Sequence, residues 1–299
     1  MSFVNPGPLV QRAREEGYAV PAFNSNGGNY DIARASLEAA DEMRSPVILQ
    51  VYEPNCTYRG FAYVANLCRF LCEELAITVP VALQLDHGHS LESVLQAMRA
   101  GFTGVMFDAS HEPLRENIDR TREVVRAAKA FGAAVEAEIG YVKGNEPKPQ
   151  KQIGRVSVPE KPAMEPVFTD LAEARTFVES VEVSMLAVSV GTTHGVYQSQ
   201  TDVNFDLLTT LRDALPVPLV QHGTCGISLE DLGRLARNGM AKINFGEPFR
   251  YDYIRSFTEL TDQMEHLWHP WRIQEATKER LKAYMQEIIT AIGSAGKAE

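Results

Sequence analysis

Eight short apolar runs, each followed by a stretch with helical patterning, most strongly constrain how this 299-residue chain can fold. Residues 29–43, after the first run, show such a helical pattern. Near-continuous apolar strands that alternate with helices are typical of a parallel sheet covered on both faces. The predicted strands are residues 18–24, 46–52, 80–88, 104–108, 133–140, 184–191, 217–223 and 240–246.

Eight such units predict the α/β class and a single closed (β/α)8 TIM barrel, so that residues 1–299 form one domain. A doubly wound open sheet is the competing architecture. A G-x-G-x-x-G turn after the first strand would favour that alternative, and the sequence has none there.

Two segments fall outside the repeating pattern. Residues 141–168 are rich in Pro, Lys and Glu and follow the fifth predicted strand, at the end of the barrel where active sites lie. We expect a mobile lid there, with a plain surface loop as the alternative. Residues 271–294 form an extra amphipathic C-terminal helix, which we expect to pack on the barrel or on a second subunit.

Composition narrows the classes of partner. The net charge of -10 argues against nucleic acid and anionic membranes as partners. No apolar stretch approaches the roughly 20 residues that span a bilayer, and the N-terminus lacks a signal-peptide pattern. Four cysteines are too few for a disulfide scaffold, and Cys68 and Cys72 share one helical face, which indicates a core position. These features predict a cytoplasmic protein.

Three histidines close apolar runs and are each followed directly by glycine: His87, His194 and His222. Three imidazoles with one open position are a catalytic zinc arrangement. The alternative is that each histidine only ends a strand and caps a hydrogen bond. Because three of the seven histidines share this context, we favour one zinc ion.

Carboxylates accompany these histidines at the predicted strand ends. Asp86 precedes His87, and Asp108 follows the fourth strand. Glu136 and Glu138 alternate with alanine and so share one face, where each can serve a core ion pair or the site; Glu138 lies nearer the C-terminal end and is the better site candidate.

A zinc ion at this position would act as a Lewis acid, and the neighbouring carboxylates could accept and donate protons. This chemistry supports an enolate-forming reaction or a hydrolysis, and residue spacing alone does not separate the two. Glu146, within residues 141–168, is a candidate mobile base or else a solvated surface charge.

At these residues the sequence resembles the class II, zinc-dependent aldolases that cleave fructose and tagatose bisphosphates. The resemblance covers the whole predicted barrel. It is carried by AFN (22–24), LDHG (85–88), DASH (108–111), VEAEIG (135–140), GTTHGVY (191–197), HGTCG (222–226) and KIN (242–244).

The resemblance implies a role for each matching residue. His87, His194 and His222 are implied to bind Zn²⁺, with Glu138 near or on the metal. Asp86 is implied to be the acid/base at the cleaved bond and Glu146 the lid base. Asn244 is implied to steady the enediolate. The implied substrate contacts are Asn24, Gly195, Gly223 and Gly226, together with Tyr52, Gln198, Cys225 and Glu247.

The last four of these residues depart from the family pattern. The family typically places lysine, two serines and threonine there, around the phosphate of dihydroxyacetone phosphate. Gln198, Cys225 and Glu247 remove a cation and two hydroxyl donors and add an anion, and Tyr52 stands where serine is frequent. We therefore expect a donor end without phosphate, such as dihydroxyacetone. The alternative is that basic residues such as Arg250 take over and phosphate still binds.

The predicted function is a zinc-dependent class II aldolase that reversibly cleaves a ketose or ketose phosphate through an enediolate. Its partner would be a small carbohydrate, and the resemblance implies a homodimer or homotetramer. The alternatives are an ordinary fructose or tagatose bisphosphate aldolase, a metal-dependent sugar epimerase that uses retro-aldol chemistry, and a zinc hydrolase. A non-catalytic binding protein ranks last, because it predicts eroded metal ligands.

Overall fold

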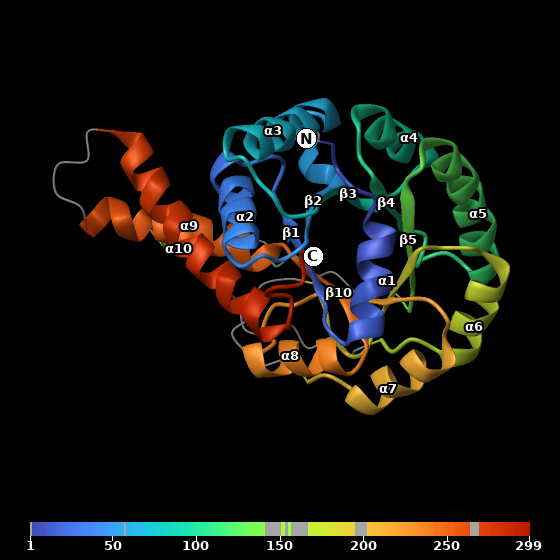
Figure 1. The fold of residues 1–299 in the computed structure, drawn as a ribbon. Helices are drawn as coiled ribbons and strands as arrows, with labels where there is room; N and C mark the ends of the chain where they lie inside the picture. The colour runs from blue at the N-terminus through green and yellow to red at the C-terminus, as the bar shows by residue number, and fades with distance from the viewer. Residues whose placement is uncertain are drawn as a thin grey trace.

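A closed barrel of eight parallel strands forms the centre of the protein (Figure 1). The computed structural model describes residues 2–56, 58–140, 151–152, 155–156, 167–194, 202–263 and 269–299. The strands follow the order β1-β10-β9-β8-β5-β4-β3-β2 around the barrel, which confirms the predicted fold class. Their bounds are β1 Val20–Asn24, β2 Val47–Tyr52, β3 Val81–Gly88, β4 Gly104–Phe107, β5 Ala134–Ile139, β8 Met185–Val188, β9 Leu219–Gln221 and β10 Met240–Phe245.

Helices surround the barrel and bury their apolar faces against the outer surfaces of the strands. Several begin at a residue whose side chain accepts a backbone N–H of the first turn, as Asn29, Ser90 and Ser228 do. Cys68 and Cys72 are buried in α3, in the predicted core position. The bounds are α1 Pro6–Glu16, α2 Tyr30–Glu42, η1 Glu53–Cys56, α3 Phe61–Glu74, α4 Leu91–Ala100, α5 Leu114–Phe131, α6 Leu171–Ser180, α7 Phe205–Ala214, α8 Leu229–Arg237, α9 Glu247–Gln263 and α10 Pro270–Ala291.

Helix α1 closes the N-terminal end of the barrel, a feature that the strand pattern did not predict (Figure 1). It contacts β1, β3, β5 and β10. Its residues Val10 and Ala13 belong to a buried cluster with Val20, Ile48 and Val220 from the barrel interior. Because side chains fill this end, a substrate must enter from the C-terminal end of the strands.

Helix α10 corresponds to the extra C-terminal helix predicted at residues 271–294. It packs on α2, α8 and α9, and with α9 it extends away from the barrel (Figure 1). Lys278 of α10 donates to Glu38 of α2 at 2.5 Å, and this ion pair joins the C-terminal helix to the barrel wall. The expectation of a second subunit here stays a prediction.

The segment predicted as a lid lies largely outside the described residues. Within it, β6 (Lys151–Gln152) pairs antiparallel with β7 (Arg155–Val156). Glu146 lies outside the described residues. Among the helices that the structure describes, none combines the length and the apolar composition needed to cross a membrane.

Steric constraints explain why glycine follows histidine at the two described positions, Gly88 and Gly223. A Cβ added at Gly88 would lie 2.8 Å from the carbonyl oxygen of Met106. Gly223 has a φ of +67°, and a Cβ there would lie 2.6 Å from the carbonyl oxygen of Thr193. The close approach of the loops after β8 and β9 therefore requires glycine at position 223.

We expect Gly223→Ala to lower the free energy of unfolding by about 3 kcal/mol, because positive φ costs roughly 1–2 kcal/mol and the Thr193 backbone must also move. The matched control is Gly17→Ala, since Gly17 has a φ of +73° with nothing within 4 Å of an added Cβ. Urea denaturation of both variants measures the difference, and equal losses would refute the steric explanation.

Candidate active site

The three histidines converge at the C-terminal mouth of the barrel. His87 lies in β3, His222 directly follows β9, and His194 lies in the loop after β8. The ring centroid of His87 lies 4.9 Å from that of His222 and 5.2 Å from that of His194, and the remaining pair is 5.7 Å apart. One ring nitrogen of each lies within 4.8 Å of the other two. The convergence expected from the sequence is therefore present.

The conformation of His87 was not predicted. Its backbone φ is +49°, in the left-handed region that residues with a Cβ rarely adopt. The β3–β4 ladder shifts register between Leu85 and Gly88, on either side of this residue. Adjacent strand residues normally point to opposite faces, yet Asp86 and His87 both line the same cavity. The irregularity therefore brings a carboxylate and an imidazole from consecutive positions to one site.

Two of the imidazoles use one nitrogen to contact a buried carboxylate. Nδ1 of His87 lies 2.7 Å from Oδ2 of Asp108, and Nε2 of His222 lies 2.7 Å from Oε1 of Glu136. Their other nitrogens, Nε2 of His87 and Nδ1 of His222, face each other at 3.1 Å. Ligands about 2.1 Å from a tetrahedral metal ion such as zinc lie roughly 3.4 Å apart, so the spacing of these two nitrogens is compatible with a shared divalent metal ion.

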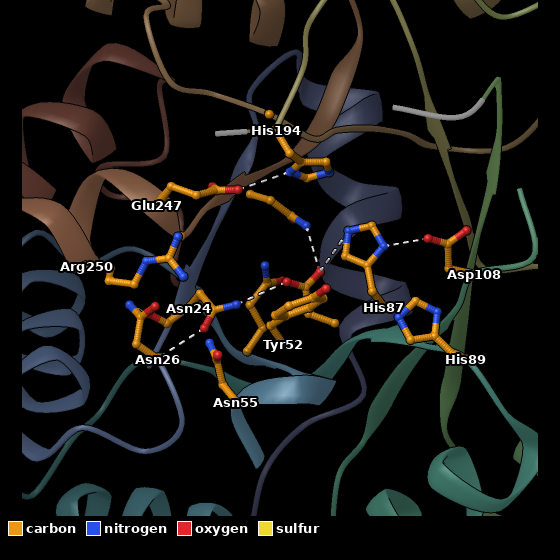
Figure 2. A pocket seen from close by; sticks show the side chains of 15 residues that line it. Asn24, Asn26, Tyr52, Asn55, His87, His89, Asp108, His194, Glu247 and Arg250 are labelled. Carbon is orange, nitrogen blue, oxygen red and sulfur yellow. Dashed lines mark hydrogen bonds and ion pairs between the residues drawn. The ribbon is translucent and has the colours of Figure 1, made fainter. Parts of the chain in front are cut away.

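His194 follows the same pattern. Its Nδ1 lies 3.3 Å from Oε1 of Glu247, as the dashed line in Figure 2 marks. With Nδ1 in that contact, Nε2 is the other nitrogen that the ring can offer to a metal ion. Each imidazole thus has a carboxylate behind it, an arrangement that orients metal-binding histidines in proteins.

The local field favours a cation. Burial lowers the pKa of His87, but Asp86 and Asp108 raise it by more, to about 10. Burial raises the pKa of Glu247, while the hydrogen bond from His194 and nearby positive charge lower it to about 2. A field that stabilises an imidazolium so strongly also favours a divalent cation, which would displace that proton.

Glu136 forms the core ion pair that the sequence left open, and it also contacts the site. Its Oε2 accepts from Nζ of Lys242 at 2.8 Å and from Nε2 of Gln84 at 2.6 Å. Both members of the ion pair are fully buried. Burial raises the pKa of Glu136, but Lys242 and His222 lower it to about 2. The Glu136 carboxylate next to His222 is therefore ionised, with Lys242 as its counter-ion.

We expect Lys242→Met to lower the free energy of unfolding by roughly 3–5 kcal/mol, because Glu136 would remain buried without its cation. The double variant Glu136→Gln/Lys242→Met should recover part of that loss. Lys129→Met is the control: its ion pair with Glu182 is 2.8 Å long but exposed, so the expected loss is below about 1 kcal/mol. Equal losses for the two lysine variants in chemical denaturation would contradict this prediction.

Asp86 lies on the wall of a cavity of about 200 Å³ beside the histidines. Its carboxylate accepts from Nδ2 of Asn24 at 3.0 Å and from Nδ2 of Asn244 at 3.4 Å. Two amides thus hold one carboxylate oriented toward the cavity. The other predicted site residues on this wall are Asn24, Asn244, His87, His194, Tyr52, Gly223 and Glu247, whereas His222 is fully buried and does not line it.

Other predicted residues lie away from the cavity wall. Glu138 is buried, accepts from Ser110 at 3.2 Å, and forms a second potential ligand group with His87 and Asp108. Cys225 and Gly226 do not line the cavity, and Cys225 is buried. Gly195, Gln198 and Glu146 lie outside the described residues.

The sequence reasoning missed several polar residues on the cavity wall: Asn26, Gln50, Asn55 and His89. Asn26, Asn55 and His89 follow the first three strands, and Gln50 lies inside β2 two residues before its end, so polarity near strand ends is the signal that could have found them. The contacts of Asp108, Glu136 and Glu247 with the imidazoles were also missed. No spacing rule joins residues that the barrel brings together from distant strands.

A β/α barrel with imidazoles and carboxylates gathered at its C-terminal mouth has the architecture of a barrel enzyme. Residues 4–297 match the family described as "Fructose-bisphosphate aldolase class-II". The chain is 36% identical to the fructose-bisphosphate aldolase of Geobacillus stearothermophilus, over 100% of this chain and 99% of that protein. It is also 36% identical to the 6-phospho-5-dehydro-2-deoxy-D-gluconate aldolase of Bacillus licheniformis, over 100% and 97% of the two chains.

The crystal structure of the YdjI aldolase from Escherichia coli K12 matches with a TM-score of 0.83 at 30% identity, over 99% of this chain and 100% of that one. The chain therefore belongs to the class II fructose-bisphosphate aldolase family. It is a class II aldolase, a carbon–carbon lyase that acts on a small carbohydrate. Class II aldolases generally depend on a divalent metal ion, in accord with the donor set described above.

Proposed function

We propose that the protein is a zinc-dependent class II aldolase that reversibly cleaves a ketose whose donor end carries no phosphate. The whole chain, residues 1–299, would form this one catalytic domain. The observation that carries the proposal is the convergence of three imidazoles, each with a carboxylate behind it, beside the carboxylate of Asp86.

His87, His194 and His222 would hold the zinc ion, with Glu138 next to them. When bound, zinc would act as a Lewis acid on the ketone oxygen. The carboxylates of Asp108, Glu136 and Glu247 would keep the three imidazoles in the tautomers that present a lone pair to the metal.

Asp86 would carry the proton of the reaction. In the cleavage direction its carboxylate accepts the proton of the substrate hydroxyl as that carbon becomes an aldehyde, and in the addition direction it returns it. Asn24 and Asn244 would hold the carboxylate in place through their amides. Asn244 would also donate to the developing oxygen of the enediolate. Glu146, by the family resemblance, would move the proton at the donor carbon.

The absence of phosphate from the donor is supported by Glu247, whose carboxylate is ionised at neutral pH and lines the cavity. Two unit charges about 5 Å apart repel by about 3 kcal/mol at an effective dielectric of about 20. Dihydroxyacetone would fit such a site. Its hydroxyl groups would be bound near Tyr52 and Gln198, with Gly195 and Gly223 permitting close backbone approach.

Arg250 favours the second candidate, an ordinary fructose or tagatose bisphosphate aldolase. Its guanidinium lines the same cavity as Glu247, where it supplies a cation for a phosphate. A sugar epimerase that cleaves and re-forms the same bond would use the same proton carriers. The two alternatives differ in product: an epimerase accumulates a stereoisomer, and an aldolase releases a free three-carbon fragment.

Aldol addition to D-glyceraldehyde with zinc-loaded protein tests the donor. We expect kcat/KM for dihydroxyacetone to exceed that for dihydroxyacetone phosphate by roughly a hundredfold, the ratio that about 3 kcal/mol produces. NMR spectroscopy of the products reports both addition and epimerisation. A preference for the phosphorylated donor would sink the proposal and leave the bisphosphate aldolase.

His194→Ala tests the metal centre. We expect zinc affinity, measured by competition with a fluorescent chelator, to fall by more than about a hundredfold, because one of three imidazole ligands is removed. His111→Ala is the control, since the side chain of His111 is 54% exposed and lies outside the histidine cluster. Unchanged zinc binding by the His194 variant would refute the ligand set.

We also propose that the enzyme is a cytoplasmic homodimer or homotetramer. The support is the arm formed by α9 and α10, which extends from the barrel and exposes Ile254 and Trp271. Light scattering during size-exclusion chromatography measures the assembly, and a monomeric mass at micromolar concentration would contradict it.

A further inference from the structure

Glu247 occupies a position that fixes both its charge and its direction. It is the first residue of α9, one residue after Gly246 and two after the end of β10. Its carboxylate accepts from its own backbone N–H, and a helix N-terminus stabilises negative charge. From there the side chain reaches Nδ1 of His194 at 3.3 Å, and Figure 2 shows it directed at that ring.

His194 differs from the other two histidines in its place relative to the strands. His87 belongs to β3, and His222 directly follows β9 with Gly223 against the Thr193 carbonyl. His194 instead lies six residues beyond Val188, the last residue of β8. The contacts of its side chain therefore help to set the orientation of its ring. The described partner on its Nδ1 side is Glu247.

We propose that Glu247 is a positioning residue, which accepts the Nδ1 proton of His194 and so aims Nε2 at the metal centre. This inference rests on the ligand set of the proposed function. Asp108 and Glu136 reach the other two imidazoles at 2.7 Å from the wall of the barrel, and Glu247 completes the set from a helix on the opposite side. The anion in the cavity wall thus acts on the protein's own imidazole, in addition to its repulsion of a phosphate at the donor end of a substrate.

Three variants test this proposal. Glu247→Leu keeps the approximate shape and removes the acceptor, whereas Glu247→Gln keeps an oxygen that can accept the Nδ1 proton. Glu247→Asp keeps the charge but shortens the side chain, which takes the carboxylate out of hydrogen-bonding range. Asp252→Asn is the control, because Asp252 lies on the same helix and pairs with Arg255 at 3.1 Å, away from the cavity.

The readouts are the zinc dissociation constant, by chelator competition, and the visible absorption spectrum of the cobalt-substituted protein. We expect Glu247→Leu and Glu247→Asp to weaken zinc binding by about 10–100-fold and to shift the cobalt bands. Glu247→Gln should restore most of the affinity, to within about fivefold of the wild type, and Asp252→Asn should match it within about twofold.

Zinc affinity and cobalt bands unchanged in the Leu and Asp variants would overturn the proposal. A raised KM for substrate with unchanged zinc affinity would instead make Glu247 a substrate contact, which also overturns it. Should the Leu variant fail to fold, the Asp and Gln variants decide between the outcomes. Wild-type protein that binds zinc without cleaving any ketose would defeat the proposed reaction and leave this test of Glu247 intact.

Discussion

The buried contact between Glu136 and its three partners is the interaction on which the site depends. A carboxylate with no exposed surface is tolerated only where positive charge and hydrogen-bond donors surround it. Lys242, Gln84 and His222 provide them from β10, from β3 and from the end of β9. The same contact joins strands across the barrel interior and orients an imidazole toward the centre of the mouth. The same side chains therefore stabilise the barrel interior and orient a predicted metal ligand.

Further negative charge lies next to the histidines, on Asp86 and Asp108. Asp86 and Asp108 raise the pKa of His87 to about 10, against the effect of burial. Buried negative charges destabilise the fold unless a cation balances them. This is the electrostatic basis for a divalent metal at the centre. The closed end of the barrel, filled by α1, leaves the opposite mouth as the entry for substrate.

The sequence was sufficient for the barrel because its signals are local. Each apolar run predicted from the pattern corresponds to an observed strand, with observed ends within four residues of those predicted. Part of the cavity wall, including Asp86, His194 and Asn244, was also predicted, because polar side chains at strand ends stand out against apolar runs. By contrast, α1 was not predicted, because a short helix before the first strand lies outside the repeating pattern and its sequence does not indicate where it packs.

By itself the amino-acid sequence determined the number of β/α units, the three histidines and the family. Only the tertiary structure decided how these groups meet. The left-handed backbone of His87 turns two consecutive side chains into one cavity, and the carboxylates of Asp108, Glu136 and Glu247 each reach a different imidazole. The physical reason is that hydrogen bonds between residues from distant strands depend on barrel closure, strand register and side-chain burial. None of these three properties produces a periodic pattern in the amino-acid sequence.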